Sequence, residues 1–286
     1  MTAAPAQETT ERDPVATARA LYLDLIQRVL VNSIYEDPGM LYPDGATREE
    51  IAQHRETVAF DRKRRLNGFD FPSQAHTMIG TRRMDNLREC VETVLADGVP
   101  GDLMETGVWR GGATIFMRAI LKAHDVTDRK VWVADSFEGL PPADADAYPV
   151  DAGIPFDAMT DVLGVSLEQV QENFRRYDLL DEQVHFLKGF FRDTLPDAPV
   201  ERLAVLRLDG DMYESTINAL DSLYPRLSPG GFLIIDDYRL VPACRQAVTD
   251  YRAAHGITTT ITAIDACGSF WRKEDDAGPS RARGLA

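Results

Sequence analysis

The chain has 286 residues and a mass of 31.8 kDa, which suits one large domain or one domain with a helical attachment. Hydrophobic residues make up 44% and charged residues 27%, and the formal net charge is -15 with a pI of about 4.8. This acidic balance excludes the basic face that nucleic-acid binding requires. No stretch is long and apolar enough to span a membrane. We therefore expect neither a nucleic-acid partner nor a membrane partner.

The cysteines and the N-terminus favour a reducing compartment. Cys90, Cys244 and Cys267 stand far apart and form neither a CxxC pair nor a zinc-binding spacing. The N-terminal segment MTAAPAQETTERDPVATA is polar and lacks the apolar region of a signal peptide. A cytoplasmic location follows as the expectation.

The predicted elements begin after a tail over residues 1–13, which is expected to be disordered. Residues 14–98 show a helical pattern and predict an N-terminal helical region. In its first helix the apolar residues predicted to share one face are Leu21, Leu25, Ile26, Val29 and Leu30. A charged stretch, EEIAQHRETVAFDRKRRLNG, and an amphipathic helix, TRRMDNLRECVETVLADG, follow.

From residue 99 to residue 274, short apolar strands alternate with helices. The strands are predicted at residues 103–108, 130–137, 184–189, 203–210 and 231–238. The helices are predicted at residues 113–124, 166–177, 214–227 and 241–256. TTTITAIDACGSFWRK then predicts two strands around a Cys-Gly turn, and a disordered tail over residues 275–286 ends the chain. This alternation indicates an α/β fold with a mostly parallel sheet, whose ligands bind at the carboxyl ends of the strands.

A glycine-rich loop, ETGVWRGGAT, follows the first strand of this sheet and opens its first helix. Gly107, Gly111 and Gly112 allow a sharp turn and a close approach to a ligand. A dinucleotide would require GxGxxG, which is absent, whereas S-adenosylmethionine (SAM) has cationic groups that favour an acid such as Glu105. Asp135, after the second strand, can bind the ribose hydroxyls of either cofactor. These features together favour SAM, and a dinucleotide or a tight turn without ligand stay open as alternatives.

Pairs of carboxylates end two further strands. Asp209 and Asp211 follow the apolar run LAVLRL, and Asp236 and Asp237 follow GGFLII. Because these strand ends can lie side by side, the carboxylates need a cation between them, and hard oxygen ligands match Mg²⁺. A metal there would orient an acceptor hydroxyl and lower its pKa. A helix-cap role is the alternative, which can account for Asp211 but not for the pair at residues 236–237.

In combination these motifs resemble the macrocin O-methyltransferase family. The segments that carry the resemblance are DGVPGDLMETGVWRGGA, VWVADSFEGLP, AVLRLDGDMYEST, LSPGGFLIIDDY and HTMIG, within about residues 21–272. The resemblance implies a Rossmann-like SAM-dependent methyltransferase fold over residues 99–274, with a C-terminal antiparallel strand pair. It implies that the N-terminal helices of residues 14–98 cover the active site. It further implies SAM and Mg²⁺ as cofactors. The implied acceptor is a deoxysugar hydroxyl on an antibiotic or its precursor, of the macrolide or aminocoumarin noviose type.

The resemblance also implies roles for individual residues. The implied cofactor residues are Met78, Glu105, Thr106, Gly107, Arg110, Gly111, Gly112, Asp135, Ser136, Gly189 and Phe190. The implied metal ligands are Asp209, Asp236 and Asp237. Because a metal ligand accepts a proton poorly, Asp211 is predicted as the general base, with Asp209 as the second choice. Phe71, where the family often has tyrosine, and His76 are predicted to contact the acceptor, and residues 143–166 to shape its pocket.

Three other functions remain as alternatives. A metal-dependent O-methyltransferase of catechol-like phenols would use the same cation and carboxylates. A NAD(P)-dependent oxidoreductase would need a hydride-transfer acid such as a Tyr–Lys pair, and the sequence indicates none. A non-catalytic binding module has no need of carboxylates beside a cofactor loop. We expect an O-methyltransferase that forms a homo-oligomer, a dimer or larger.

Overall fold

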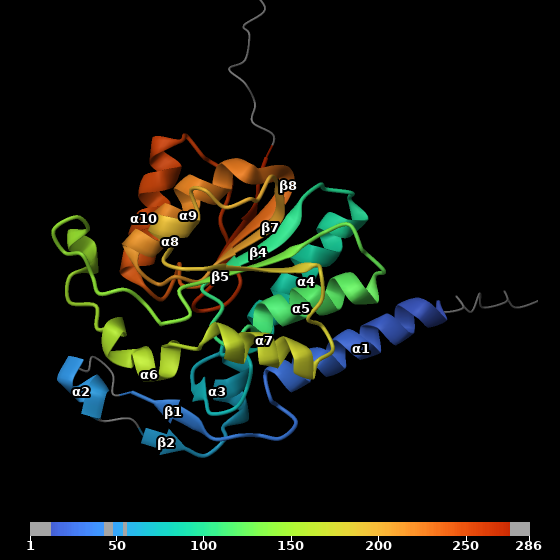
Figure 1. Ribbon diagram of the computed structural model, residues 1–286, viewed down its shortest axis with the longest axis horizontal. Coiled ribbons are helices and arrows are strands. Elements are labelled where there is room, and N and C mark those ends of the chain that lie inside the picture. The colour runs from blue at the N-terminus through green and yellow to red at the C-terminus, as the bar shows by residue number, and fades with distance from the viewer. Residues whose placement is uncertain (1–12, 43–47, 54–55, 275–286) are drawn as a thin grey trace, which may run out of the picture.

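A seven-stranded sheet forms the centre of the protein in the computed structural model, which describes residues 13–42, 48–53 and 56–274 (Figure 1). Its order is β6-β5-β4-β7-β8-β10-β9. The strands are β4 (Asp102–Thr106), β5 (Val131–Asp135), β6 (Val184–Lys188), β7 (Leu203–Leu208), β8 (Leu227–Ile235), β9 (Thr262–Ala263) and β10 (Ser269–Arg272). Strands β4 to β8 pair in parallel, and β10 pairs antiparallel with both β8 and β9. The predicted fold class, including the C-terminal antiparallel pair, is confirmed. The predicted tails fall outside the described residues, except for residue 13.

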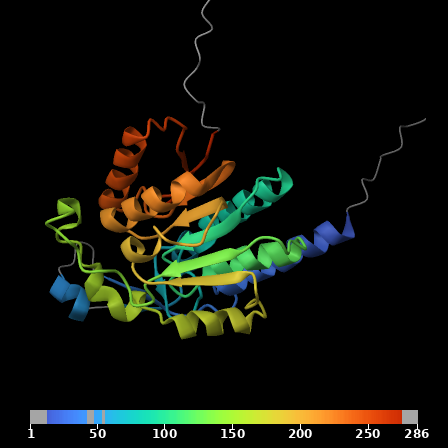
Figure 2. The same cartoon turned by 45° about the horizontal axis from the view of Figure 1, so that its top comes forward.

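Helices cover both faces of this sheet, as Figure 2 shows. The helices on one face are α1 (Pro14–Leu30), α4 (Gly80–Ala96), α5 (Gly112–Ala123) and α7 (Leu167–Arg176), and those on the other are α9 (Tyr213–Leu223) and α10 (Pro242–Ala254). The shorter elements are α6 (Thr160–Leu163), α8 (Phe191–Thr194), η1 (Pro149–Asp151), η2 (Phe156–Met159) and η3 (Tyr224–Arg226). None of the described helices has both the length and the apolar character needed to cross a membrane.

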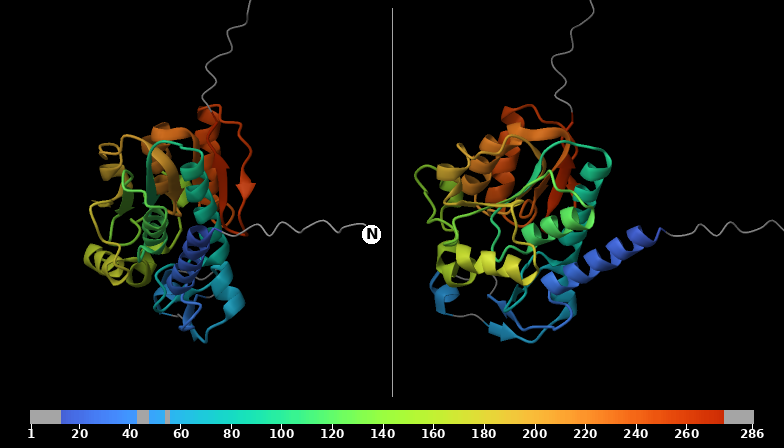
Figure 3. Two further views of the ribbon diagram at one scale, coloured as in Figure 1. Left: turned by 90° about the vertical axis from the view of Figure 1, so that its right-hand side faces the viewer. Right: turned by 45° about the vertical axis from the view of Figure 1, so that its right-hand side comes forward.

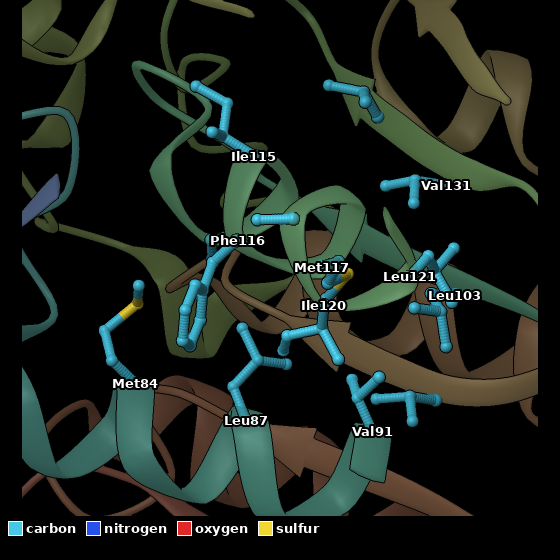
Figure 4. Close-up of a cluster of buried hydrophobic side chains, with 14 of the residues drawn as sticks. Met84, Leu87, Val91, Leu103, Ile115, Phe116, Met117, Ile120, Leu121 and Val131 are labelled. Carbon is cyan, nitrogen blue, oxygen red and sulfur yellow. The ribbon is translucent and has the colours of Figure 1, made fainter. Parts of the chain in front are cut away.

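Side chains that alternate along each strand fill two separate hydrophobic clusters. Leu103 and Val131 join the cluster under α4 and α5, whereas their neighbours Met104 and Trp132 join the cluster under α9 and α10. Figure 4 shows the first cluster, in which the apolar face of α4 meets α5 and the strands. This cluster crosses the predicted domain boundary at residue 98, because α1 and α4 share it with the sheet. The N-terminal region and the sheet therefore have a common core.

The N-terminal region is not purely helical, contrary to the prediction. It contains α2 (Arg48–Gln53), α3 (Arg62–Asn67) and a small antiparallel sheet of β1 (Gly39–Leu41), β2 (Glu56–Val58) and β3 (Phe71–Pro72). Figure 3 shows this sheet at one end of the molecule. Arg65, which is 1% exposed, holds the region together by ion pairs with Asp37 and Asp70. The helical prediction was wrong because β1 finds its partners far away in the sequence.

The buried face of α1 agrees only in part with the predicted one, because Leu30 is buried as expected and Ile26 packs against the core. Leu23, Gln27 and Leu30 are buried, whereas Leu21 and Leu25 are 66% and 54% exposed. Apolar residues occur on several sides of this helix, so the sequence pattern did not define one face. Its packing against α5, where Arg19 donates to the carbonyl of Ala123 at 2.9 Å, decides which side is buried.

Candidate active site

A cleft of about 600 Å³ lies at the carboxyl ends of the parallel strands. It opens at the switch point of the sheet, since β5 and β6 lie on one side of β4 and β7 and β8 lie on the other. Ligands of such sheets bind at this position, and the volume suits a small molecule. Residues 68–71 and 77–79 form one wall, and side chains from residues 139–163 form another. The floor comes from the strand ends.

Gly107 marks the tightest point of the glycine-rich loop. Its φ is +83°, and a Cβ atom there would lie 1.7 Å from the carbonyl oxygen of Asp209. The ends of β4 and β7 therefore approach so closely that no side chain fits at residue 107. This contact places the loop and the strand-end carboxylates around one cleft.

Asp135 both holds the glycine-rich loop and lines the cleft. One carboxylate oxygen accepts from the backbone N–H of Val108 at 2.7 Å, and the other accepts from that of Phe137 at 2.8 Å. Burial raises the pKa of Asp135. Each oxygen also accepts a longer bond of 3.4 Å, Oδ2 from the N–H of Trp109 and Oδ1 from the hydroxyl of Ser136, so a ligand hydroxyl would replace one of these two weaker contacts.

Glu105, at the end of β4, is fully buried in the floor of the cleft. Its Oε1 accepts from Arg207, and its Oε2 has no hydrogen-bond partner among the described residues. Burial raises the pKa of Glu105, whereas the adjacent guanidinium of Arg207 opposes the shift and favours the carboxylate. A buried carboxylate oxygen that lacks a donor is unfavourable, so this position suits a cationic or hydrogen-bonding ligand group.

The other predicted cofactor residues divide into two groups. Met78, Gly107, Ser136 and Phe190 line the cleft with Glu105 and Asp135. Thr106, Arg110, Gly111, Gly112 and Gly189 are not among the residues that line it.

Two residues of the second group hold the N-terminal segment instead. Arg110 donates to the carbonyl oxygens of Pro72 and Ala75 at 3.0 and 2.8 Å. A Cβ atom on Gly112 would lie 2.3 Å from the carbonyl oxygen of His76. Both contacts bring the segment that contains Met78 against the start of α5, where it forms the cleft wall.

Three carboxylates gather where β7 and β8 end. Asp209, Asp211 and Asp237 each offer an oxygen, and these oxygens lie within 4.8 Å of one another. Oδ2 of Asp237 is buried and has no partner among the residues that the structure describes. Burial, and then the neighbouring carboxylates, raise the pKa of Asp211 and of Asp237. This donor set fits a hard dication.

Asp236, a predicted metal ligand, lies next to these three carboxylates but has other partners. Arg207 donates to its Oδ1 and Arg83 donates to its Oδ2. The structure thus groups Asp211, rather than Asp236, with Asp209 and Asp237. The sequence did not indicate this because the arginine partners come from β7 and α4, and only the tertiary structure brings them together.

Asp211 does not cap the helix that follows it, so that alternative is wrong. The N-cap residue of α9 is Met212, and it makes no side-chain capping bond. The carboxylate of Asp151, at the end of η1, instead accepts from the backbone N–H groups of Tyr213 and Glu214. Asp211 itself has a φ of +56°, a left-handed conformation that is uncommon for a residue with a side chain.

The two predicted acceptor residues lie in different places. Phe71 lines the cleft, whereas His76 is not among the lining residues. Nδ1 of His76 lies 2.6 Å from the hydroxyl oxygen of Tyr177. Burial, followed by Arg176 and Arg110, lowers the pKa of His76 to about 4. This contact with the residue that follows α7 suits a neutral structural histidine.

Sequence reasoning missed Arg207, Arg83 and Asp151. A charged residue within the apolar run LAVLRL was a usable signal for Arg207. Arg83 lay within an ordinary amphipathic helix pattern, and Asp151 within an irregular acidic loop. Neither of those patterns distinguishes a buried charge from a solvated one.

Comparisons with known proteins identify the family. The model of the macrocin O-methyltransferase family matches residues 19–273. A tetracenomycin 4'-O-methyltransferase of Streptomyces olivaceus, which acts on a dimethoxyrhamnosyl derivative, is 58% identical over 89% of this chain and 93% of its own length. The demethyldecarbamoylnovobiocin O-methyltransferase of Streptomyces niveus is 52% identical over 89% and 94%. The mycinamicin III 3''-O-methyltransferase of Micromonospora griseorubida is 54% identical over 90% and 98%.

Solved structures agree with this assignment. The O-methyltransferase NovP superposes with a TM-score of 0.81 at 50% identity, over 90% of this chain and 99% of its own. A calicheamicin methyltransferase at 17% identity, with a TM-score of 0.54 over 95% of this chain and 99% of its own, shares the fold. The chain belongs to the macrocin O-methyltransferase family and is an O-methyltransferase.

Proposed function

We propose that this enzyme transfers the methyl group of SAM to a hydroxyl of a deoxysugar on an antibiotic or its precursor, and that the reaction requires Mg²⁺. The observation that carries the proposal is the placement of two acidic sites on one cleft. Glu105 and Asp135 lie at the ends of β4 and β5, and the carboxylates of Asp209, Asp211 and Asp237 lie just beyond the ends of β7 and β8. A methyl donor and an activated hydroxyl would meet between them.

Three cleft residues support SAM as the cofactor. The partnerless oxygen of Glu105 suits the ammonium group, and the carboxylate of Asp135 suits the ribose hydroxyls. Phe190 offers an aromatic face at the end of β6, where the adenine would lie. We propose that Arg110, Gly111 and Gly112 act indirectly, by holding the wall of residues 77–79. In the same way we propose residues 14–98 as the cover of the active site.

The carboxylates support a magnesium site. Asp209 and Asp237 belong both to the set implied by the family resemblance and to the group within 4.8 Å. We propose both as metal ligands. Asp236 would be the third ligand, after the metal replaces one of its two arginine partners. Asp211 then keeps its basicity and takes the proton of the acceptor hydroxyl. Mg²⁺ would lower the pKa of that hydroxyl and orient it toward the methyl group.

A sugar attached to a large apolar body is the proposed acceptor. By their names, the three relatives act on a rhamnosylated tetracenomycin, on demethyldecarbamoylnovobiocin and on mycinamicin III. At the rim of the cleft, Phe69 and Leu240 are 48% and 59% exposed. Phe156 and Met159, from the loop predicted to shape the acceptor pocket, also line the cleft. These apolar side chains suit an aglycone that stays at the mouth while its sugar enters.

We also propose that the chain forms a homo-oligomer. Val15, Leu21 and Leu25 expose large apolar side chains on α1, which extends from the body in Figure 1. Light scattering on the wild type and on Leu21→Glu would test this, because a charge on that face should shift the protein toward the monomer.

Turnover with labelled SAM and a panel of acceptors tests the main proposal. The panel should contain an aminocoumarin with unmethylated noviose, a macrolide with a demethylated deoxyhexose, and a simple catechol. We expect methylation of a glycoside, loss of activity with EDTA and recovery on addition of MgCl₂. Methylation of the catechol alone would favour the phenol alternative, and full activity after exhaustive chelation would rule out the metal.

A further inference from the structure

One guanidinium group lies between the proposed cofactor site and the proposed metal site. Arg207 is 1% exposed, on β7 between β4 and β8. Its Nη1 donates both to Oε1 of Glu105 and to Oδ2 of Asp209, the latter at 2.8 Å, and its Nη2 donates to Oδ1 of Asp236. If one of these carboxylates moves away from Arg207, the positive charge of the guanidinium acts more strongly on the carboxylates that remain.

A second arginine, Arg83, extends the network of Arg207 beyond Asp236. The second oxygen of Asp236 accepts from Arg83, whose Nε lies 3.2 Å from a carboxylate oxygen of Asp265. Arg83, Asp236 and Asp265 are all buried. Away from water, charges are screened weakly, so a charge added at one end of the network is felt at the other.

We propose that Arg207 couples the two sites, so that a divalent cation bound at Asp209 weakens the binding of SAM at Glu105. The inference rests on the proposed function, because it takes Glu105 as the partner of the SAM ammonium and Asp209 as a metal ligand. When the carboxylate of Asp209 turns to a dication, the positive charge of Arg207 is shared by fewer carboxylates. Glu105 is then more fully neutralised and attracts an ammonium less strongly. By linkage, SAM weakens the binding of the metal by the same factor.

Calorimetric titration of the wild-type protein with SAM, in EDTA and in saturating MgCl₂, measures the coupling directly. We expect the Kd for SAM to be at least about fivefold higher with Mg²⁺, within the usual range of coupling between sites. An equal or lower Kd with Mg²⁺ would overturn the inference. Failure of SAM to bind under either condition would instead refute the proposed function, and the coupling with it.

Glu105→Gln tests the route of the coupling. The amide oxygen still accepts from Arg207, but the negative charge that both partners share is gone. We expect weaker SAM binding that no longer depends on Mg²⁺. If the dependence persists, the dication acts on SAM directly, and Arg207 is not the link.

If this variant binds SAM too weakly to measure, the wild-type protein is titrated with methylthioadenosine in place of SAM. It lacks the amino-acid part, so its Kd should not depend on Mg²⁺, and a dependence like that of SAM would overturn the inference.

Arg207→Lys and Arg118→Lys form a matched pair. A lysine keeps the charge, but its single ammonium cannot bridge Glu105 and Asp209 as the guanidinium fork does. Arg118 is buried as well and pairs with Asp181 at 2.5 Å, and neither residue lines the cleft. We expect the Mg²⁺ effect on SAM binding to shrink in the first variant and to persist in the second. Equal effects in two folded variants would contradict the role of Arg207.

Discussion

Oδ1 of Asp151 accepts a hydrogen bond of 2.7 Å from the backbone N–H of Tyr213, the first residue of α9. The other carboxylate oxygen accepts from the next N–H, that of Glu214, at 3.0 Å. A negative charge at a helix N-terminus is favourable, because free N–H groups and the helix dipole meet it there. The loop that carries Asp151 is thereby fastened beside Asp211, the proposed base.

Asp151→Ala should lower the free energy of unfolding by about 0.5–2 kcal/mol, the usual value of a helix cap. It should also lower kcat, because the backbone around Asp211 loses its support. Urea denaturation and steady-state kinetics measure the two effects. Asp144→Ala is the matched control, since Asp144 accepts an exposed bond of 3.1 Å from the N–H of Ala147 in the same loop. That change should stay within about 0.5 kcal/mol. Equal losses in both variants would contradict the capping role.

Asp211→Asn should lower kcat by roughly 10²–10⁴ while SAM binding persists, because an amide cannot take the proton of the acceptor hydroxyl. Asp209→Asn should lose Mg²⁺ affinity and activity together. Single-turnover assays with calorimetric titration of MgCl₂ separate the two outcomes. A loss of Mg²⁺ affinity in Asp211→Asn, comparable with that in Asp209→Asn, would show that Asp211 is a ligand, as its place in the carboxylate group permits.

Asp135→Ala should weaken SAM binding at least about tenfold, because each charge-assisted hydrogen bond to the ribose contributes roughly 1.5–3 kcal/mol. The variant also removes the acceptor for the N–H groups of Val108 and Phe137, so the loop above the cofactor loosens. Asp135→Asn is the conservative control, because it keeps one acceptor oxygen and should lose less affinity. Unchanged SAM affinity in a folded Asp135→Ala variant would remove this residue from the cofactor site.

The partly buried imidazole of His76 should make the protein less stable as the pH falls. Its pKa is about 4 in the folded protein and near 6.5 in an unfolded chain. Between these values the unfolded chain binds a proton that the folded protein does not, so the free energy of unfolding decreases from pH 6.5 toward pH 4, by about 3 kcal/mol at most. Above pH 6.5 the imidazole is neutral in both states and has no such effect.

Urea denaturation of the wild type and of His76→Asn at several pH values measures this effect, since the difference between the two proteins cancels the titration of the carboxylates. The stability of the wild type relative to the variant should fall as the pH drops below 6.5. A difference that stays constant over this range would show that His76 does not resist protonation.

Part of the active site could be predicted from the sequence alone. In parallel strands the carboxyl ends meet at one edge, so the acids that end β4 and β5 and those that follow β7 and β8 had to line up there. Gly107 was predictable in the same way, because a loop that turns from a strand into a helix needs a residue that tolerates positive φ. These inferences succeed because they depend on local backbone geometry and on strand direction.

The partners of those acids were decided only by the tertiary structure. Glu105, Asp209 and Asp236 share one guanidinium group because β7 lies between β4 and β8, an order that strand patterns do not specify. The carboxylate that accepts from the first N–H groups of α9 belongs to Asp151, 62 residues before Tyr213, so no local pattern indicated it. Hydrophobic and backbone patterns act over a few residues and are visible in sequence. The pairing of buried charges depends on which distant side chains the completed fold brings within a few ångströms.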